Sequence, residues 1–256
     1  MRFFCVNDGV PEATVRLLRE ACVARAVDYI EIDPRTFDYA DGVSTFYADS
    51  DGIFFNATTS PLLFQRAGLP IPRTYYCPSA SRELLDSYVD RLGGFPVVVK
   101  LLGYSSGVGT MRADSSPALY SLIDFALAEG KSPLVCAYID EAVHWRLVVV
   151  GDQVVSAYRN RQDGEDFRTY AADDPADFLE PPPPDSVELA VRAVKVLHSE
   201  FGGVDVLAHP SGRLYLLEAN FPCYFATGEE VIGTDVSGAM IDHLVAKAAR
   251  LTAASG

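Results

Sequence analysis

The chain has 256 residues, of which 49% are hydrophobic and 22% charged, a composition typical of a folded protein with a sizeable core. Its formal net charge of −14 argues against binding to nucleic acid or anionic lipid, because like charges repel. The sequence contains no apolar run long enough for a membrane span or a signal peptide, so we expect a cytoplasmic protein.

The five cysteines are odd in number and widely spaced, and no CxxC pair occurs. This pattern favours reduced thiols over a zinc site or a disulfide framework, which also fits a cytoplasmic location.

The first third of the chain predicts a strand at 3–6, a helix that begins at Pro11, and a second strand at 29–32. This is a small βαβ unit, too short for a complete dinucleotide-binding domain. It lacks a GxGxxG motif, so nothing in it indicates a nucleotide.

The middle of the chain predicts a different arrangement of helices and strands. The expected elements are a helix at 62–67, an extended crossing segment at 69–74, a helix at 81–92, strands at 97–101 and 110–112, and a helix at 117–130.

The last half is rich in predicted hairpins. The expected elements are a hairpin of strands 147–150 and 154–158, a polar irregular stretch at 160–184, a helix at 185–201, a hairpin at 204–220, and a final helix at 236–251.

The hairpin at 204–220 carries polar side chains in an apolar setting. If its turn is centred near position 211.5, Asp205 faces Glu218 across the two strands, and Asn220 lies on the same face. Two opposed carboxylates repel each other in an empty sheet, whereas together with an amide oxygen they suit a hard dication such as Mg²⁺. The alternative is that the acids face solvent or pair with Lys or Arg.

Lys100 ends an apolar strand, where its ammonium group can reach a phosphate. The next residues form a loop rich in glycine and serine, whose backbone N–H groups could cover phosphates. The loop has no GK[ST] motif, so it is not a Walker loop, and a glycine-rich hairpin turn is the alternative.

Arginines lie on or just after the first C-terminal hairpin, at positions 146, 159, 161 and 168. Planar guanidinium groups suit phosphate and acyl-phosphate oxygens. The alternative is ion pairing with nearby acids, namely Asp163, Glu165 and Asp166.

The order of these elements along the chain resembles the ATP-grasp superfamily, specifically its RimK-like ligases, over residues 53–248. The resemblance is carried by five blocks: 67–74 (AGLPIPRT), 96–100 (PVVVK) with Gly107 and Gly109, 134–139 (LVCAYI), 146–168 ending in DFR, and 203–220.

The resemblance implies an α+β ATP-grasp fold, in which two α+β lobes grip ATP, preceded by a truncated βαβ domain. We expect this N-terminal domain at 1–57, the central lobe at 58–133 and the C-terminal lobe at 134–256. The resemblance also implies an enzyme that activates a carboxylate as an acyl phosphate and couples it to an amine, with ATP and Mg²⁺ (or Mn²⁺) as cofactors. Relatives often form dimers or tetramers.

The resemblance assigns roles to matching positions. Lys100 would hold the α- and β-phosphates, and the loop would cover them through Ser105, Ser106, Gly107 and Gly109. The backbone of Ala137, Tyr138 and Ile139 would bind adenine. Arg168 would lie near the triphosphate, and Arg146 and Arg161 would face the acyl phosphate. The Mg²⁺ ligands would be Asp205, Glu218 and Asn220.

The chain departs from the family pattern at three places. A second ATP-binding lysine is replaced by Ala57, and the ribose-binding acid is replaced by His144. The segment after Arg168, which borders the acceptor pocket in relatives, reads TYAADDP here. We therefore expect an acceptor other than a ribosomal tail, such as an amino acid or small peptide in a biosynthetic pathway.

Two alternative functions remain from the sequence. One is an ATP-grasp kinase, which stops at phosphoryl transfer. The other is a nucleotide-binding regulatory or scaffold protein with a degenerate site, which the loss of lysine at Ala57 favours.

Overall fold

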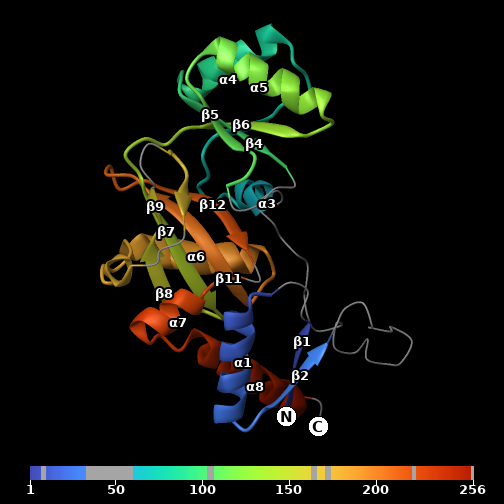
Figure 1. Ribbon diagram of the computed structural model, residues 1–256, viewed down its shortest axis with the longest axis vertical. Coiled ribbons are helices and arrows are strands. Elements are labelled where there is room, and N and C mark those ends of the chain that lie inside the picture. The colour runs from blue at the N-terminus through green and yellow to red at the C-terminus, as the bar shows by residue number, and fades with distance from the viewer. Residues whose placement is uncertain are drawn as a thin grey trace, which may run out of the picture.

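The computed structural model describes residues 1–6, 10–32, 60–102, 107–162, 166–170, 174–220 and 223–254. Within them lie two four-stranded antiparallel sheets, each with its own helices, and a small parallel pair of strands at the end of the molecule that holds both termini (Figure 1). Among these residues, no helix combines the length and the apolar character needed to cross a membrane. All five cysteines are buried and free, as expected.

The N-terminal unit is the expected βαβ motif. Strands β1 (Arg2–Val6) and β2 (Asp28–Ile32) pair in parallel and are joined by α1 (Glu12–Ala24). Helix α1 packs against the long C-terminal helix α8 (Val236–Ala254), where Leu18 joins a core cluster with Met240. Arg25 reinforces this contact through ion pairs of 2.8 Å with Asp235 and 2.7 Å with Asp242. The unit is thereby held to the C-terminal end of the chain.

The first lobe is a sheet of strand order β3-β6-β4-β5. Its elements are β3 (Thr74–Tyr76), α4 (Arg82–Leu92), β4 (Val97–Leu101), β5 (Thr110–Ala113), α5 (Ser116–Ala128) and β6 (Pro133–Ala137). Helices α4 and α5 cover one face, on which Val97, Val99 and Val135 are fully buried. Because side chains alternate along a strand, Lys100 lies on the opposite face. The expected boundary between the lobes, at 133/134, falls within β6. This strand pairs with β3 and β4, both of which belong to the first lobe.

The second lobe is a sheet of strand order β12-β11-β7-β8. Its strands are β7 (Val143–Val150), β8 (Gln153–Arg159), β11 (Phe201–Ala208) and β12 (Leu214–Asn220). Helices α3 (Ser60–Arg66) and α6 (Pro184–Val196) pack on one face around Leu147, Val204 and Leu216. On the other face, α8 and the region before α7 (Ala226–Ile232) cover only the end near Val148 and Val150.

Two crossings of the chain join the lobes. One is the segment 69–73, as expected, and the other is the hinge, which we define as residues 138–142 between β6 and β7. Backbone hydrogen bonds of 2.8 Å from Leu216 N to Pro70 O and 2.9 Å from Ala137 N to Arg73 O attach the segment 69–73 to both lobes.

The structure corrects the sequence interpretation at several elements. The helix predicted at 185–201 ends at Val196, because His198 adopts a left-handed conformation with φ of 53°, and Phe201 already belongs to β11. The polar stretch at 160–184 contains a short hairpin of β9 (Arg161–Gln162) and β10 (Thr169–Tyr170) and a 3-10 helix (Pro175–Phe178). Strand β3 and helix α7 were not anticipated.

The packing of α3 generates a stability prediction. Phe64 is fully buried against the second sheet, whereas Leu62 on the same helix is 50% exposed. We expect Phe64→Ala to lower the free energy of unfolding by about 3–5 kcal/mol, because it removes buried apolar surface and leaves a cavity. Leu62→Ala is the matched control and should cost less than about 1 kcal/mol. Urea unfolding at equilibrium measures both, and equal losses would contradict the assigned packing.

Candidate active site

The predicted pairing of Asp205 with Glu218 is confirmed, although the hairpin reaches it differently from the sequence interpretation. Near the turn, Ala208 pairs with Leu214 and Val206 pairs with Leu216, so the turn is centred one half-residue earlier than expected. A β-bulge then shifts the register between Val206 and Asp205 and inserts Leu217 as an extra residue. The bulge lets Leu216 face the core while Glu218 faces the cleft.

A row of polar side chains crosses the second sheet from this hairpin. In register, it runs from Glu218 through Asp205 and Arg146 to Tyr158. The Arg146 guanidinium donates from Nε to Asp205 Oδ1 at 2.7 Å and from Nη2 to Oδ2 at 2.9 Å, a two-point contact that fixes the carboxylate. His144 Nε2 lies 3.0 Å from Oδ1 of the same carboxylate.

Asp205 is only 3% exposed, yet it is held in its charged form. Burial by itself raises the pKa of Asp205, but the charges and hydrogen bonds of Arg146 and His144 outweigh burial and hold the pKa well below its usual range. The alternative that the acids pair with Arg is therefore realised for Asp205.

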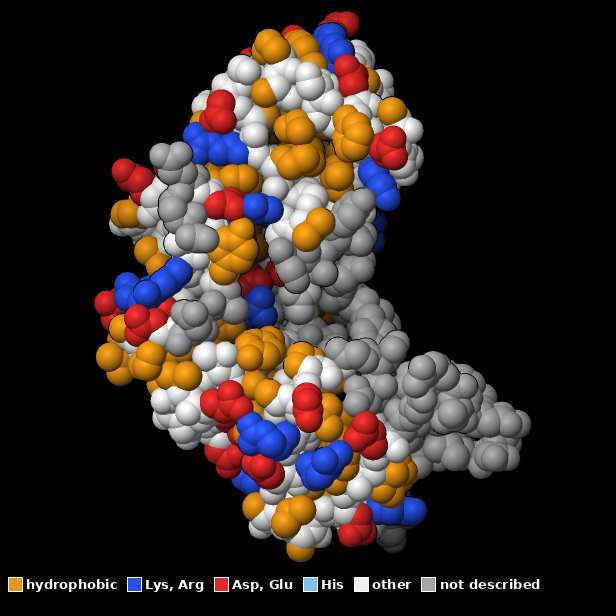
Figure 2. All heavy atoms as spheres, in the orientation of Figure 1, with side chains coloured by type: hydrophobic (Ala, Val, Ile, Leu, Met, Phe, Trp, Pro, Cys, Tyr) orange, Lys and Arg blue, Asp and Glu red, His pale blue; other side chains and the backbone are white. Residues whose placement is uncertain are grey.

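Glu218 lies beside this pair, and its pKa shifts in the opposite direction from that of Asp205. Burial, followed by the charge of Asp205, raises the pKa of Glu218, while a 2.6 Å hydrogen bond from Asn220 Nδ2 and the charges of Lys100 and Arg146 partly counteract the rise. Figure 2 shows the hollow between the lobes, with acidic and basic side chains at its floor.

The three predicted metal ligands lie on adjacent positions of one sheet face. A dication would relieve the repulsion between Glu218 and Asp205, and it could use the lone pairs of Asp205 that Arg146 leaves free together with the amide oxygen of Asn220. In the described part of the chain, no group of three or more His, Cys, Asp or Glu side chains is arranged to hold a metal ion. Two carboxylates and an amide suit a cation such as Mg²⁺, which completes its shell with phosphate oxygens and water.

The loop after Lys100 approaches the arginine block. Gly107 and Gly109 have positive φ values of 75° and 74°, and a Cβ atom at Gly107 would lie 3.5 Å from Cδ of Arg168. Ser105 and Ser106, two of the predicted phosphate contacts, lie outside the described residues, as does Ala57. The loop glycines and Arg168 therefore border the same part of the cleft.

The predicted catalytic arginines each have an acidic partner. Arg168 donates from Nη2 to Oδ2 of Asp166 at 2.6 Å. The alternative that these arginines pair with nearby acids is therefore realised for Arg168. Arg161 donates from Nε to Asp177 Oδ1 at 2.6 Å, and Asp177 is 2% exposed. Arg161 thus anchors β9 to the 3-10 helix, whereas Arg146 alone among the three contacts Asp205.

The residues predicted to bind adenine lie at the end of β6 and the start of the hinge. Tyr138 stacks under the Arg112 guanidinium, 4.8 Å from the ring centroid, and meets the Phe167 ring edge-on at 6.4 Å. The Ala137 N–H is already used by Arg73 O, so it does not face a free ligand position. His144 also contacts the Thr169 hydroxyl and links Asp205 to the segment after Arg168.

Several site residues were missed by the sequence interpretation. A Cβ atom at Gly203 would approach Nη1 of Arg146 to 2.7 Å, so glycine at this position leaves the room that Arg146 occupies. A glycine inside a strand signals such a close approach and could have been noticed. The contribution of Arg112 comes from its register opposite Val98, which no local motif reveals.

The buried ion pair generates a stability prediction. Arg146→Gln should lower the free energy of unfolding by about 3–5 kcal/mol, because it leaves the Asp205 carboxylate buried without its cationic partner. The matched control is Arg82→Gln, which breaks the exposed Arg82–Asp124 pair and should leave the urea midpoint almost unchanged. A midpoint for Arg146→Gln equal to that of the control would contradict the assigned role of the pair.

Comparisons with known proteins agree with this geometry. A model of the RimK-like ATP-grasp domain matches residues 56–244. The ribosomal protein bS6–L-glutamate ligases of Shigella boydii and Escherichia coli are 32% identical over 183 residues, which cover 70% of this chain and 59% of the relatives' length.

Solved structures share the fold at lower identity. The ATP-grasp ligase PsnB in complex with precursor peptide PsnA2 and AMPPNP has a TM-score of 0.68 at 18% identity and covers 95% of this chain and 97% of that one. The macrocyclase MdnC bound with precursor peptide MdnA, from Microcystis aeruginosa, has a TM-score of 0.64 at 15% identity, with 96% and 99% covered. These likenesses, together with the two antiparallel sheets, confirm the α+β ATP-grasp fold. The chain belongs to the RimK-like ATP-grasp family.

Proposed function

We propose that the chain is an ATP- and Mg²⁺-dependent carboxylate–amine ligase. The γ-phosphoryl group of ATP passes to a substrate carboxylate and gives an acyl phosphate and ADP. An amine then attacks the acyl carbon, phosphate leaves, the amine loses a proton, and an amide bond remains. The chain spans about 59% of the length of the curated relatives that it matches. The proposal therefore rests on family membership together with the chemistry of the cleft.

The observation that carries the proposal is the pair of opposed, desolvated carboxylates on the cleft face of the second lobe, with Lys100 on the sheet face of the first lobe that is opposite α4 and α5. Glu218 and Asp205 repel each other, and the raised pKa of Glu218 records the cost of that arrangement. A purely structural sheet would be more stable without this repulsion. A site that takes up a cation together with phosphates turns the same arrangement into a ligand set.

The chain's own residues account for the handling of charge. Lys100 would neutralise the α- and β-phosphates, the N–H groups near Gly107 would cover them, and Arg168 would approach the triphosphate from the other side. Arg146 would hold Asp205 in its charged form beside the acyl phosphate. When bound, Mg²⁺ supplies neutralisation of the charge on the phosphoryl group during transfer.

We propose a peptide or amino acid as the substrate. One named relative joins glutamate to a ribosomal protein, and solved structures of the same fold hold precursor peptides. The segment after Arg168 differs from the family pattern, which supports an acceptor other than the ribosomal tail. The five buried free cysteines fit a cytoplasmic location, where thiols stay reduced.

ADP release tests the proposal. Panels of carboxylates and peptides are assayed with ATP and Mg²⁺, with and without amines. We expect release that requires both a carboxylate and an amine. Release with a phosphoryl acceptor alone, yielding a stable phosphorylated product, would instead identify a kinase, and nucleotide binding with no release in any panel would identify a regulatory protein.

Glu218→Gln separates catalysis from stability. We expect Mg²⁺-dependent turnover to fall at least about 100-fold, because a metal ligand is lost. Since the folded-state pKa of Glu218 is raised, ionisation of this group opposes folding at pH 7, so the variant should unfold at the same or a higher temperature than the parent. This advantage should shrink as the pH falls through the raised folded-state pKa of Glu218 and vanish below the unfolded-state pKa of about 4.3, where the parent carboxyl is protonated in both states. Undiminished turnover would contradict the metal assignment.

A further inference from the structure

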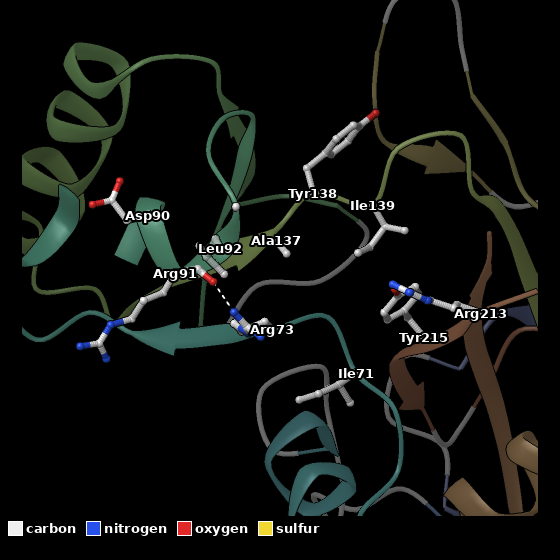
Figure 3. Close-up of a pocket in the computed structure, with 11 residues that line it drawn as sticks. Ile71, Arg73, Asp90, Arg91, Leu92, Ala137, Tyr138, Ile139, Arg213 and Tyr215 are labelled. Carbon is white, nitrogen blue, oxygen red and sulfur yellow. Dashed lines mark hydrogen bonds between the residues drawn. The ribbon is translucent and has the colours of Figure 1, made fainter. Parts of the chain in front are cut away.

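A second cavity lies behind the hinge, outside the cleft that holds the phosphate and metal residues. It has a volume of about 630 Å³, within the range of sites that bind small ligands. The crossing segment contributes Ile71 and Arg73, the hinge contributes Ile139, and the start of β12 contributes Arg213 and Tyr215 (Figure 3). We call this cavity the hinge pocket.

The hinge pocket adjoins the ATP cleft at the hinge, because Ala137, Tyr138 and Ile139, the residues predicted to bind adenine through their backbone, also line it. It contains none of the phosphate or metal residues, since Lys100, Asp205 and Glu218 do not line it. The Tyr138 ring points away from Arg73, on the opposite side of the hinge from Ile139 (Figure 3), and makes its contacts with Arg112 and Phe167. The two sides of the hinge therefore present different surfaces.

The hinge pocket is positively charged in a chain with a net charge of −14. Arg73 and Arg213 form no ion pair with any residue that the structure describes, whereas the arginines of the ATP cleft discussed above, namely Arg112, Arg146, Arg161 and Arg168, each pair with an acid. Arg73 donates from Nη1 to the backbone carbonyl of Arg91, which leaves its other donors free. Unpaired guanidinium groups on two sides of one cavity suit carboxylates.

The surface between the two arginines is apolar. Ile71 and Ile139 are half-buried and lie between Arg73 on one side and Arg213 with Tyr215 on the other (Figure 3). The acid that borders the cavity, Asp90, sits on α4 with its carboxylate directed away from Arg73 (Figure 3). An occupant must therefore combine negative charge with apolar groups.

We propose that the hinge pocket binds an acidic peptide segment, with carboxylates at Arg73 and Arg213 and an apolar side chain against Ile71 and Ile139. A peptide fits this pattern because its side chains can alternate between acidic and apolar types along one backbone. A nucleic acid fits it poorly, since two arginines offer little against the repulsion from the rest of the chain. This recognition site goes beyond the proposed ligase chemistry and does not require it.

The test is peptide binding to the full chain without ATP or Mg²⁺, so that its result is independent of any ligase activity. The probe is a fluorescein-labelled octapeptide of alternating Glu and Leu, followed by fluorescence anisotropy, and the reference is the Gln–Leu octapeptide. We expect the Glu–Leu peptide to bind at least tenfold more tightly than the Gln–Leu peptide, since each charged contact is worth about one order of magnitude or more.

Arg213→Gln and Arg73→Gln should each weaken binding of the Glu–Leu peptide about tenfold. Arg213 forms no hydrogen bond or ion pair through its side chain with any residue that the structure describes, so its variant should fold normally. A thermal melt checks Arg73→Gln, whose contact with α4 is removed. The matched control is Arg192→Gln on α6, an exposed arginine that forms no ion pair within the described part of the chain. It removes the same charge and should change binding less than twofold.

Three results would overturn the proposal. One is an equal loss of binding in the Arg192→Gln control, which would indicate general charge attraction. Another is equal binding of the Gln–Leu peptide. The third is displacement of the probe by free glutarate at the same concentration as by unlabelled peptide, which would identify a site for a small dicarboxylate instead.

Discussion

A carboxylate that is 3% exposed keeps its charge only if a cation sits against it, and in this fold that cation is Arg146. The contact spans strands β11 and β7, so it fixes the register at the centre of the second sheet. Gly203 leaves the room that the guanidinium needs, and His144 closes the other side of the carboxylate. The position of Glu218 follows from the same arrangement, because its strand pairs with the one that carries Asp205.

The two lobes are built to keep their facing surfaces polar. Each sheet has its own core cluster on the face turned away from the cleft, and two backbone crossings connect them. A lobe with a separate core can move as a unit relative to its neighbour. Grip on a nucleotide would therefore come from the approach of two preformed surfaces, one with Lys100 and one with the carboxylates.

Much of this architecture could be predicted from sequence, for reasons that differ from element to element. The continuous apolar run at 97–99 predicted β4 and placed Lys100 near its end, and the hairpin positions of Asp205 and Glu218 were predicted correctly. The bulge that produces that pairing was invisible, because no glycine marks it. The end of α6 was missed because His198, not glycine, takes the left-handed conformation that stops the helix. The hinge pocket joins residues as far apart in the sequence as Arg73 and Arg213, which are 140 positions apart, and local patterns carry no information on such a meeting.

The bulge at Leu217 lets the hairpin carry one extra residue while its polar side chains keep their faces. With the extra residue, Ala219 and Leu216 share the core face although three positions separate them, and Glu218 and Asn220 are left facing the cleft. Loss of Leu217 would remove the bulge and restore the regular alternation, in which Leu216 and Ala219 still face the core and Glu218 still lies opposite Asp205. The bulge thus absorbs one residue of chain length without moving Glu218 off the face that it shares with Asp205.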